Sequence, residues 1–557
     1  MIMAGQDDEL LFVPLGGAEE IGMNFNLYGF GPPGEHDWLI IDLGITFGDD
    51  TTPSIDVILP DPQFIEDRLS QLAGIVLTHG HEDHLGAVPY LWGRLRCPVY
   101  ATPFTAALLR RKLEADKQPA AVEIIEIPLK GKFSVGPFEL ELITLTHSMP
   151  EPNAVVLRTP LGNIFHTGDW KFDPDPVIGA ASDQVALKAL GDEGVLAAIG
   201  DSTNVFVEGV SGSEAALLDR LTEVIGRCNG KVAVACFASN VARLKTIFQA
   251  AAANGRAVAL VGRSLWRINA AARETGYLTD LPAFLEPEDT AAMVDAEILY
   301  ICTGSQGEPR AALTRIAADD HRSVKLGDGD TVIFSSRIIP GNELAIGRLH
   351  NALIKRGADV ISELDEDIHV SGHPARGELA EMYQLVRPQI LIPVHGEQRH
   401  LKKHAELGAE CQVPESVLVE NGSVVRIAPG KAAIIDQAPV GRLALDGGRL
   451  VPLDGQVVRE RSRVLFNGSA VFTLIVDAEG AMTAPPQLTM LGLADDDEAP
   501  YVLEQLTEEA KTAIAEMSAA DRRDDTEIGE MTRRAVRRHL RDTFHKRPLT
   551  TVHVVRV

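Results

Sequence analysis

Three histidines and an aspartate occur within one eight-residue stretch, Thr78–Leu85, directly after a short apolar run. In an extended chain, side chains two residues apart point the same way, so His79 and His81 can bind one metal ion. Asp83 and His84 lie beyond the turn and can reach a second ion. A solvated polar loop is the alternative, but imidazoles and a carboxylate at this density suit zinc or manganese better.

Four apolar runs end close to a residue that can bind metal. They are Ile75–Leu77 before His79, Leu142–Leu145 before His147, Asn163–Phe165 before Asp169, and Ile390–Val394 before His395. We expect these ligands, carried at strand ends, to converge on one edge of a sheet. The expected scheme has one ion on His79, His81 and His147, the other on Asp83, His84 and His395, and Asp169 bridging.

Such a site has a defined chemistry. A water held between two divalent ions becomes acidic enough to act as a nucleophile near neutral pH, and both ions stabilise the charge on the attacked centre. We expect two ions per chain, zinc first, with manganese or magnesium as alternatives. Asp42 ends a strand that we assign to the same sheet, and we expect it to orient the histidine ligands or the water.

The composition limits the classes of partner. The 557 residues carry a net charge of −27, which argues against a large electropositive face, so any contact with nucleic acid must be local. The apolar runs are strand-length, far short of the roughly 20 residues of a membrane span. Five scattered cysteines without a CxxC pair suggest neither disulfides nor a thiolate zinc site. The start of the chain shows no secretion signal, so we expect a cytoplasmic protein.

The elements that must position these residues fall into five segments. Short β-like runs and helices over 1–212 indicate sheets covered by helices, and this domain resumes at 356–428 because His395 lies there. Residues 213–355 alternate βα with almost no candidate ligands, which is typical of a parallel, doubly wound insert. Gly and Pro punctuate 429–460, interpreted as a linker. A small α+β domain follows at 461–557.

Further motifs extend the metal-binding turn. They are Gly16–Gly22, Gly200–Asn204, Ser335–Glu343, His369–His373 and Pro393–Glu397. With that turn, the chain resembles the metallo-β-lactamase superfamily, its β-CASP nucleic-acid-processing branch and, within that branch, the bacterial ribonuclease J family. The resemblance implies an αββα sandwich with an inserted doubly wound β-CASP domain and a small α+β C-terminal domain. One position departs from the pattern: Met23 stands where a basic residue is expected.

The resemblance also implies roles in catalysis. His373 is the expected proton donor to the leaving 3′ oxygen, with Asp201 orienting it, and Asp83 joins them as a catalytic residue. A carboxylate partner raises the pKa of an imidazole and fixes its tautomer. An ordinary turn-capping aspartate is the alternative for Asp201.

Other residues are expected to hold substrate phosphates. The resemblance suggests His369 and Ser371 for one phosphate, and the backbone of Phe237, Ala238, Ser239 and Asn240 for a 5′ phosphate at a helix N-terminus. N-capping by Ser239 or Asn240 is the alternative for this turn. Arg337 is a further phosphate contact or a solvated arginine.

The C-terminal domain carries arginines at helical spacing. They are Arg533, Arg534, Arg537, Arg538 and Arg541. A solvated helix paired with acidic neighbours is preferred over an RNA-binding face, given the acidic chain.

The expected function is a two-metal ribonuclease, a 5′-to-3′ exonuclease on 5′-monophosphorylated RNA that also cuts internally, in RNA maturation and decay. The expected partners are RNA, other RNA-decay proteins and further copies of the same protein in a homodimer or homotetramer. No association with a membrane is expected. A hydrolase of DNA, or of a small thioester or lactone, is one alternative. A non-catalytic RNA-binding or scaffolding subunit is another, although no metal position is lost.

Overall fold

The structure is a computed structural model that describes residues 5, 7–49, 51–115 and 122–557. It divides into two compact units. The first comprises Met1–Thr46 and Leu59–Val440, and the second comprises Phe47–Ile58 and Gly441–Val557.

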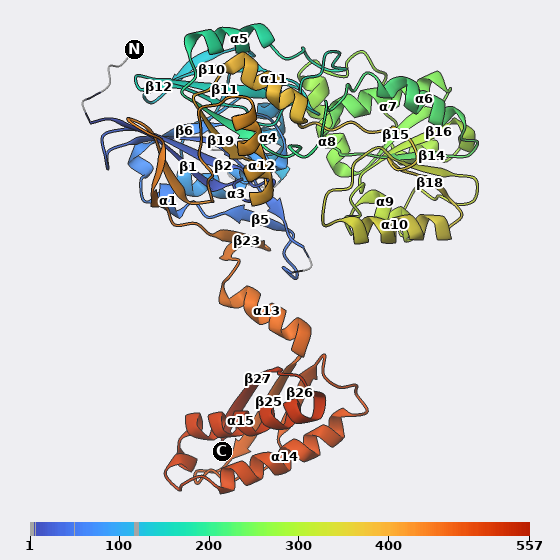
Figure 1. The fold of residues 1–557 in the computed structure, drawn as a ribbon. Helices are drawn as coiled ribbons and strands as arrows, with labels where there is room; N and C mark the ends of the chain where they lie inside the picture. The colour runs from blue at the N-terminus through green and yellow to red at the C-terminus, as the bar shows by residue number, and fades with distance from the viewer. Residues whose placement is uncertain (1–4, 6, 50, 116–121) are drawn as a thin grey trace. The chain divides into compact units, whose positions relative to one another are not determined.

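Two sheets form a sandwich in the first unit (Figure 1). One has eight strands in the order β22-β21-β1-β2-β3-β6-β7-β8, and the other has seven in the order β20-β19-β13-β12-β11-β10-β9. The bounds of the first set are, in that order, Ala433–Gln437, Ser423–Ala428, Glu9–Gly16, Phe25–Gly31, Asp37–Leu43, Leu72–Val76, Val99–Ala101 and Ile124–Glu126. Those of the second are Glu415–Ser416, Ile390–Val394, Ala197–Asp201, Gly162–His166, Asn153–Thr159, Phe138–Thr144 and Lys132–Val135.

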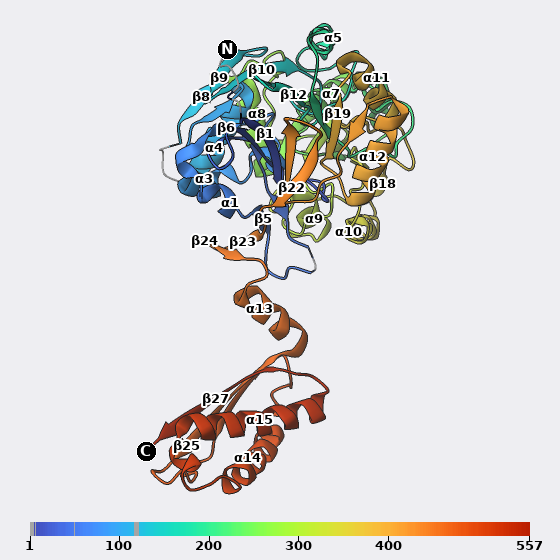
Figure 2. The ribbon, with the colours of Figure 1, turned by 60° about the vertical axis from the view of Figure 1, so that its left-hand side comes forward.

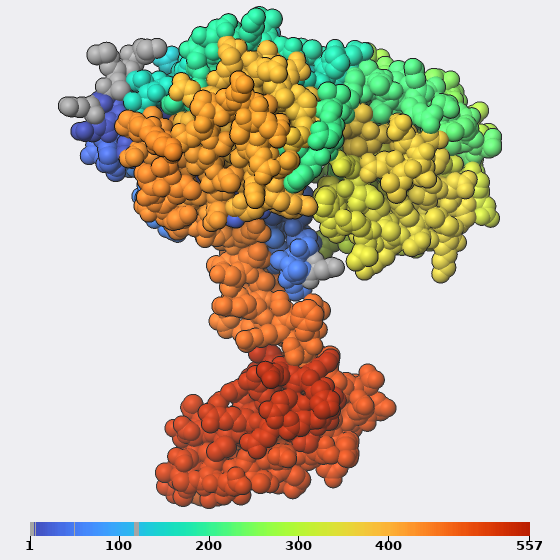
Figure 3. All heavy atoms as spheres, in the orientation of Figure 1, coloured from blue at the N-terminus to red at the C-terminus, as the bar shows by residue number. Residues whose placement is uncertain are grey.

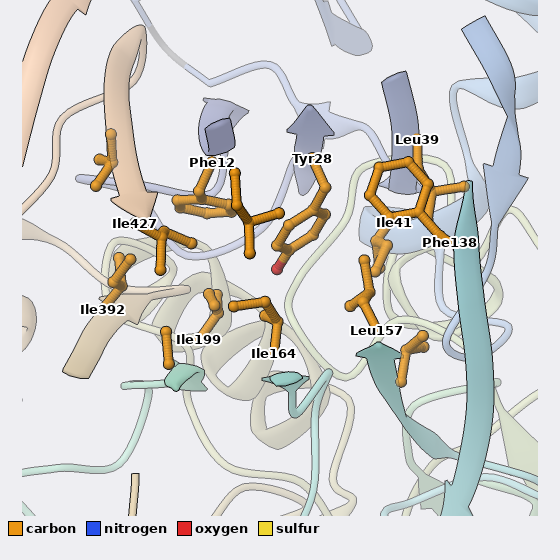
Figure 4. Close-up of a cluster of buried hydrophobic side chains, with 14 of the residues drawn as sticks. Phe12, Tyr28, Leu39, Ile41, Phe138, Leu157, Ile164, Ile199, Ile392 and Ile427 are labelled. Carbon is orange, nitrogen blue, oxygen red and sulfur yellow. The ribbon is translucent and has the colours of Figure 1, made fainter. Parts of the chain in front are cut away.

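The main core lies between these two sheets (Figure 4). Phe12, Tyr28 and Ile41 from the eight-stranded sheet face Ile164 and Ile199 from the seven-stranded sheet, and all five are buried. The one polar atom that Tyr28 brings into this layer is satisfied, because its hydroxyl lies 2.8 Å from Nδ1 of a buried histidine, His166. The long apolar runs of the sequence are thus strands buried on both faces.

Helices cover the outer faces of the sandwich (Figures 1 and 2). On the seven-stranded sheet, α5 (Gln184–Glu193), α11 (Arg376–Val386) and α12 (Gln398–Glu410) bury their apolar sides in a second cluster. On the other side lie α3 (Val88–Leu95) and α4 (Pro103–Ala115). The helices and strands expected over 1–212 are thus present, with α4 among the covering helices. The αββα sandwich is therefore confirmed.

The insert is a parallel five-stranded sheet in the order β15-β16-β14-β17-β18. Its strands are Ala257–Val261, Ile298–Cys302, Val232–Ala235, Thr331–Phe334 and Asp359–Ile361. Its main helices are α6 (Leu217–Gly226), α7 (Val241–Ala253), α8 (Arg263–Glu274), α9 (Ala312–Ala317) and α10 (Glu343–Lys355). Figure 1 shows α6 and α7 on one face and α9 and α10 on the other, which is the doubly wound arrangement predicted.

The chain leaves the sandwich after β13 and returns to the same sheet at β19. These two strands pair in parallel from Ala197 with Ile390 to Asp201 with Val394. In the space-filling view, the green and yellow surface of the insert adjoins the gold and orange surface of the returning segment (Figure 3). Residues on either side of the insert thus meet at one end of one sheet.

One expectation about the site's scaffold is wrong. The ligand-bearing strands do not share a single sheet edge. β3, which contains Asp42, and β6, which precedes His79, lie in the eight-stranded sheet. The strands before His147, Asp169 and His395 lie in the seven-stranded sheet. Apolar runs alone cannot reveal this, because strands of both sheets read alike when both faces are buried.

The second unit contains a hairpin, a helix and a small α+β fold. β23 (Arg442–Asp446) pairs with β24 (Arg449–Pro452), and α13 spans Gln456–Asn467. A three-stranded sheet follows in the order β26-β25-β27, with helices α14 and α15 packed on one face. The bounds are β25 Ser469–Val476, β26 Gln487–Leu491, α14 Ala499–Ala515, α15 Asp525–Phe544 and β27 Leu549–Arg556.

The stretch 429–460 is more than a linker. It holds β22, which pairs with β21, then the hairpin β23–β24 and the start of α13. The Gly447-Gly448 pair, which favoured a linker in the sequence, forms the turn of this hairpin. The segment boundaries drawn from the sequence remain a proposal. Among the described residues, no helix combines the length and apolar character needed to cross a bilayer.

Candidate metal centre and active site

The histidine-rich turn is seated on the neighbouring strands by backbone contacts. The strand β6 ends at Val76, and α2 (Glu82–Leu85) begins directly after His81. The carbonyl of Asp83 accepts hydrogen bonds from the backbone N–H of Asn24 at 2.9 Å and from its side-chain amide at 3.1 Å. A Cβ on Gly44 would lie 1.8 Å from the same carbonyl, so only glycine permits this close approach.

One group of ligand atoms consists of three imidazole nitrogens. His79 Nε2 lies 2.9 Å from His81 Nδ1, and His147 Nε2 lies 3.1 Å from that same atom. Asp169 Oδ2 lies 3.8 Å from His79 Nε2 and 3.9 Å from His147 Nε2. These four residues form one cluster able to hold a metal ion.

A second group of ligand atoms also includes the Asp169 carboxylate. Asp169 Oδ2 is 3.2 Å from His84 Nε2, and Asp169 Oδ1 is 3.2 Å from His395 Nε2. Asp83 Oδ2 completes this group at 3.6 Å from His84 and 3.3 Å from His395. Asp169 therefore belongs to both groups, and the structure brings all seven predicted ligands together in the two predicted sets.

The donor set fits divalent metal ions. In the described part of the chain, Asp169 Oδ1 and His395 Nε2 are buried atoms that lack a hydrogen-bond partner, although they face each other closely. In the first group, imidazole nitrogens face imidazole nitrogens, an arrangement that a shared cation stabilises. Neutral imidazoles with carboxylates, and no thiolate, suit zinc and manganese.

The protonation states also favour metal binding in the first group. Burial lowers the pKa of His81 to about 4, and it lowers the pKa values of His79 and His147 well below the usual range. These rings are therefore neutral near pH 7, with lone pairs free to coordinate. In the second group, burial is outweighed by Asp169 and its neighbouring carboxylates, which raise the pKa values of His84 and His395.

Asp42 lies behind the second group. Its Oδ2 accepts hydrogen bonds from His84 Nδ1 at 2.7 Å and from the Thr78 hydroxyl at 2.8 Å, while its Oδ1 accepts from the Thr78 N–H at 2.8 Å. With Nδ1 occupied, His84 turns Nε2 toward Asp83 and Asp169. In the first group, His147 Nδ1 donates in the same way to the carbonyl of Gly372 at 2.5 Å.

The expected acid pair lies beside the metal ligands. His373 Nδ1 is 2.8 Å from Asp201 Oδ2 and 3.9 Å from Asp169 Oδ2. Burial lowers the pKa of His373, but the carboxylates of Asp201 and Asp169 outweigh it, so the pKa is raised overall. Asp201 Oδ1 accepts hydrogen bonds from the N–H and hydroxyl of Thr203, which fixes the carboxylate.

The expected phosphate-binding residues form a looser set. Asn240 caps α7, because its Oδ1 accepts the N–H of Arg243 at 2.8 Å. Ser371 Oγ accepts a hydrogen bond from the side-chain amide of Asn204 at 2.7 Å. The exposed Arg337 lies 3.5 Å from Oδ1 of the same asparagine. His369 Nδ1 lies 3.4 Å from the buried guanidinium of Arg243. Burial, with the nearby arginines, lowers its pKa well below the usual range.

Some residues at the site could not be predicted from the sequence. Thr78, Asn204 and Gly372 each contact a predicted ligand or the acid pair through a hydrogen bond. All three stand inside or beside the motifs, but motif spacing does not reveal hydrogen-bond partners. Arg243 is fully buried and forms a two-pronged ion pair with Glu214. Nothing in the local sequence marks that pair.

Two further expectations concern residues that are not metal ligands. In α15, Arg533 and Arg534 pair with Glu530 at 2.7 and 2.8 Å, and Arg541 pairs with Asp542 at 2.8 Å. These contacts match the expected solvated helix with acidic neighbours. Met23 is 1% exposed, so the side chain at this position is buried.

Family models match most of the chain. Residues 50–190 match a beta-lactamase superfamily domain and 229–353 match a ribonuclease J beta-CASP domain. Residues 360–414 match a Zn-dependent metallo-hydrolase RNA specificity domain, and 456–557 match a ribonuclease J C-terminal domain. A ribonuclease J from Sinorhizobium meliloti is 42% identical over 99% of this chain and 98% of its own length. The chain belongs to the ribonuclease J family.

Other ribonuclease J relatives agree. The protein from Mycolicibacterium smegmatis is 38% identical over 98% of this chain and 96% of its own length. The one from Helicobacter pylori is 32% identical over 97% of this chain and 78% of its own. A solved structure of a protein of unknown function from Enterococcus faecalis, 17% identical, matches 75% of this chain and 100% of its own with a TM-score of 0.52, which supports the fold alone.

Proposed function

We propose that this member of the ribonuclease J family is a metal-dependent ribonuclease that hydrolyses RNA phosphodiesters. The observation that carries the proposal is the place of Asp169, between two groups of ligand atoms and next to the Asp201–His373 pair. A buried metal centre beside a general acid is what hydrolysis of a phosphodiester with a poor leaving group requires. The names of the relatives and of the matched domains point to RNA as the substrate.

We assign two divalent ions, zinc first, with manganese or magnesium as alternatives. His79, His81 and His147 would hold one ion, Asp83, His84 and His395 the other, and Asp169 both. When bound, the ions supply Lewis acidity, which makes water nucleophilic near neutral pH and stabilises charge on the attacked phosphate. The mixed imidazole and carboxylate set supports this choice of metals.

The protein's own groups handle the leaving group. As the bond between phosphorus and the 3′ oxygen breaks, the electron pair goes to that oxygen, which then needs a proton. His373 donates it from Nε2, because Nδ1 is held by Asp201 at 2.8 Å. Asp83 is partly exposed, so we expect substrate to reach this carboxylate. The products are a 5′ phosphate and a 3′ hydroxyl, and no 2′ hydroxyl takes part.

We assign recognition of a 5′ monophosphate to the turn before α7. In the described part of the chain, the backbone N–H groups of Phe237, Ala238 and Ser239 have no protein acceptor. Asn240 caps the helix through its own side chain, so N-capping and anion binding are compatible here. Arg337, His369 and Ser371 would contact further phosphates of the chain. Such a pocket selects for 5′-to-3′ exonuclease action, and internal cutting occurs where RNA bypasses it.

The setting of the activity follows from the substrate. RNA, including ribosomal and messenger RNA in the cytoplasm, would be matured or degraded. Other RNA-decay proteins, and further copies of this chain in a dimer or tetramer, are the proposed protein partners.

DNA is not favoured as the substrate, because the matched domain and the relatives are named for RNA. The proposed chemistry does not use a 2′ hydroxyl, so a comparison of the two polymers tests this choice directly. A scaffolding subunit is not favoured, because every ligand position is filled.

The test compares matched 5′-labelled, 5′-monophosphorylated RNA and DNA oligonucleotides incubated with the zinc- or manganese-loaded protein. Release of mononucleotides from RNA, with slower or no release from DNA, supports the proposal. The proposal would be contradicted if the RNA stayed intact although the protein held two bound ions per chain. The variant His81→Ala should be inactive and serves as a control for contaminating nucleases.

A further inference from the structure

A buried chain of three hydrogen-bonded side chains lies against the strand that carries Asp201. Ser202 Oγ is 2.8 Å from His404 Nδ1, and the hydroxyl of Tyr383 contacts Nε2 of the same ring. Ser202 and His404 are fully buried, and Tyr383 is 5% exposed. Substrate therefore cannot touch any of the three.

This chain lies on the opposite face of the sheet from the metal centre. Side chains alternate between the two faces along β13. Ile199 belongs to the core between the sheets, while Ala198 belongs to the outer cluster under α11 and α12. Asp201 thus shares the inner face with Ile199, and Gly200 and Ser202 share the outer face.

The sequence makes room for the imidazole. A Cβ on Gly200 would lie 3.3 Å from Cε1 of His404 and 3.6 Å from the hydroxyl of Tyr383. The first contact would be tight, whereas the second is an ordinary van der Waals distance. Glycine at this position lets α11 and α12 press Tyr383 and His404 directly against the end of β13.

The imidazole of His404 bridges the hydroxyls of Ser202 and Tyr383. Burial lowers the pKa of His404 to about 4, so the ring is neutral, and one of its nitrogens donates while the other accepts. In either tautomer, one hydroxyl donates to the ring and the other accepts from it, so His404 bonds to both Ser202 and Tyr383. Every polar atom in the chain is satisfied.

Ser202 sits within the turn that holds the catalytic acid. One end of this turn is Asp201, which accepts from His373 Nδ1. The other end is Asn204, whose side-chain amide donates to Ser371 Oγ at 2.7 Å and to the carbonyl of His373 at 3.0 Å. Hydrogen bonds from both ends of the turn thus hold His373 in place. The middle of the turn is anchored through Ser202.

We propose that His404 and Tyr383 are positioning residues for the Asp201–His373 pair, acting through Ser202 from the far side of the sheet. The inference rests on the proposed ribonuclease function. A small displacement of the turn moves Asp201 and His373 together, and proton donation depends steeply on such geometry. None of the three side chains contacts a metal ligand in the described structure, and the turn reaches one only through Thr203, whose hydroxyl lies 3.5 Å from His395 Nδ1. The metal content of the variants therefore has to be measured beside their rates.

The test changes one bridging atom of the substrate. Two RNA oligonucleotides are compared, identical except that in one the 3′ oxygen of the cleaved bond is replaced by sulfur. A thiolate leaves without protonation, since a thiol has a pKa of about 8.5. Cleavage of the sulfur linkage therefore needs no general acid, and the variant His373→Ala should retain it.

Two variants, Tyr383→Phe and Ser202→Ala, each remove one side-chain hydroxyl from this set of hydrogen bonds. Both should lose about 10- to 100-fold in kcat on the oxygen linkage, a part of the roughly 10²–10⁴-fold that a general acid contributes. Their kcat on the sulfur linkage, their KM and their metal content should stay at wild-type values. The matched control is Tyr300→Phe, which removes a buried tyrosine hydroxyl bonded to Thr290 in the insert and should change neither rate.

Equal losses on the two linkages would overturn the inference, because they would indicate general damage to the fold or to metal binding. Wild-type rates on both linkages would overturn it as well. Failure of the wild-type protein to cleave either RNA would instead contradict the proposed function itself. The outcomes are therefore distinguishable.

Discussion

Asp42 Oδ2 lies 2.7 Å from Nδ1 of His84 and so fixes which nitrogen of that ring faces the metal centre. The same carboxylate binds Thr78 through its hydroxyl and its backbone N–H, at the first residue of the histidine-rich turn. One side chain on β3 thus sets both the start of the turn and the orientation of a ligand within it.

The variant Asp42→Ala should weaken metal binding about 10- to 100-fold, as loss of such partners does at other metal sites. Metal content after dialysis against graded chelator measures the effect. Asp37→Ala, which alters an exposed carboxylate at the start of the same strand, is the control and should retain wild-type affinity. Unchanged affinity in Asp42→Ala would show that the contact with His84 has no bearing on the ions.

Removal of the proposed acid should separate chemistry from metal binding. His373→Ala should lower kcat on RNA by about 10²–10⁴-fold while the ions stay bound, because the imidazole donates a proton and is not one of the seven assigned ligands. His373 does form a third potential metal cluster with Asp169 and Asp201, which makes the metal analysis decisive. Single-turnover cleavage and metal analysis on the same preparation give both numbers. Loss of ions from this variant would reassign His373 as a ligand.

The 5′ pocket predicts a change in preference more than in rate. The variant Arg337→Gln should reduce the ratio of 5′-monophosphorylated to 5′-hydroxyl RNA degraded by about tenfold, in line with one lost charged contact. Internal cutting of a circular RNA should be unaffected. Arg348→Gln, at an exposed arginine on α10 of the same insert, is the matched control. An equal ratio in all three proteins would remove Arg337 from the pocket.

The junction between sandwich and insert should respond to acid. Buried Lys171 donates to the carbonyl of Gly212 at 2.9 Å and pairs with Asp173 at 3.1 Å. Burial raises the pKa of Asp173, but the hydroxyl of Ser213 and the Lys171 ammonium outweigh it, so the pKa is lowered overall. A lowered folded-state pKa contributes stability above the unfolded pKa of about 3.9, and that stability is lost as the pH falls.

The variant Asp173→Asn leaves the lysine buried without its charge partner, which costs about 3–5 kcal/mol. Its melting temperature should be several degrees below wild type from pH 7 to pH 4, and the gap should narrow only as the pH falls below about 4, toward the lowered folded-state pKa of Asp173. Thermal unfolding of both proteins from pH 7 down to about pH 2.5 measures this. A gap independent of pH would mean that the carboxylate's charge is not what stabilises the junction.

Much of the fold could be predicted from the sequence because its strands are long apolar runs. The strands before His79 and His395 were predicted within a few residues, and so was the doubly wound insert. The sheet to which each strand belongs could not be predicted, since pairing is a long-range property that local pattern does not encode. The hairpin of β23 and β24 was hidden for a different reason: its turn glycines resemble a linker.

The candidate site shows the same division. Residue type and spacing were enough to group seven ligands, because imidazoles and carboxylates at strand ends have few other uses. The contacts that orient them, such as Thr78 with Asp42 or Gly372 with His147, depend on where distant segments meet. The hydrogen bond between Ser202 and His404 joins residues 202 positions apart, and Tyr383 joins them from another helix, so no motif reveals this contact.

The central claim is that the two ligand groups and His373 together hydrolyse RNA. The most direct measurement follows 5′-labelled, 5′-monophosphorylated RNA with metal-stripped protein, before and after two equivalents of zinc or manganese are restored. The account predicts no cleavage without metal and, with metal, mononucleotides and fragments bearing 5′ phosphates and 3′ hydroxyls. Intact RNA after both ions have bound would contradict it, and so would products with 2′,3′-cyclic phosphate ends.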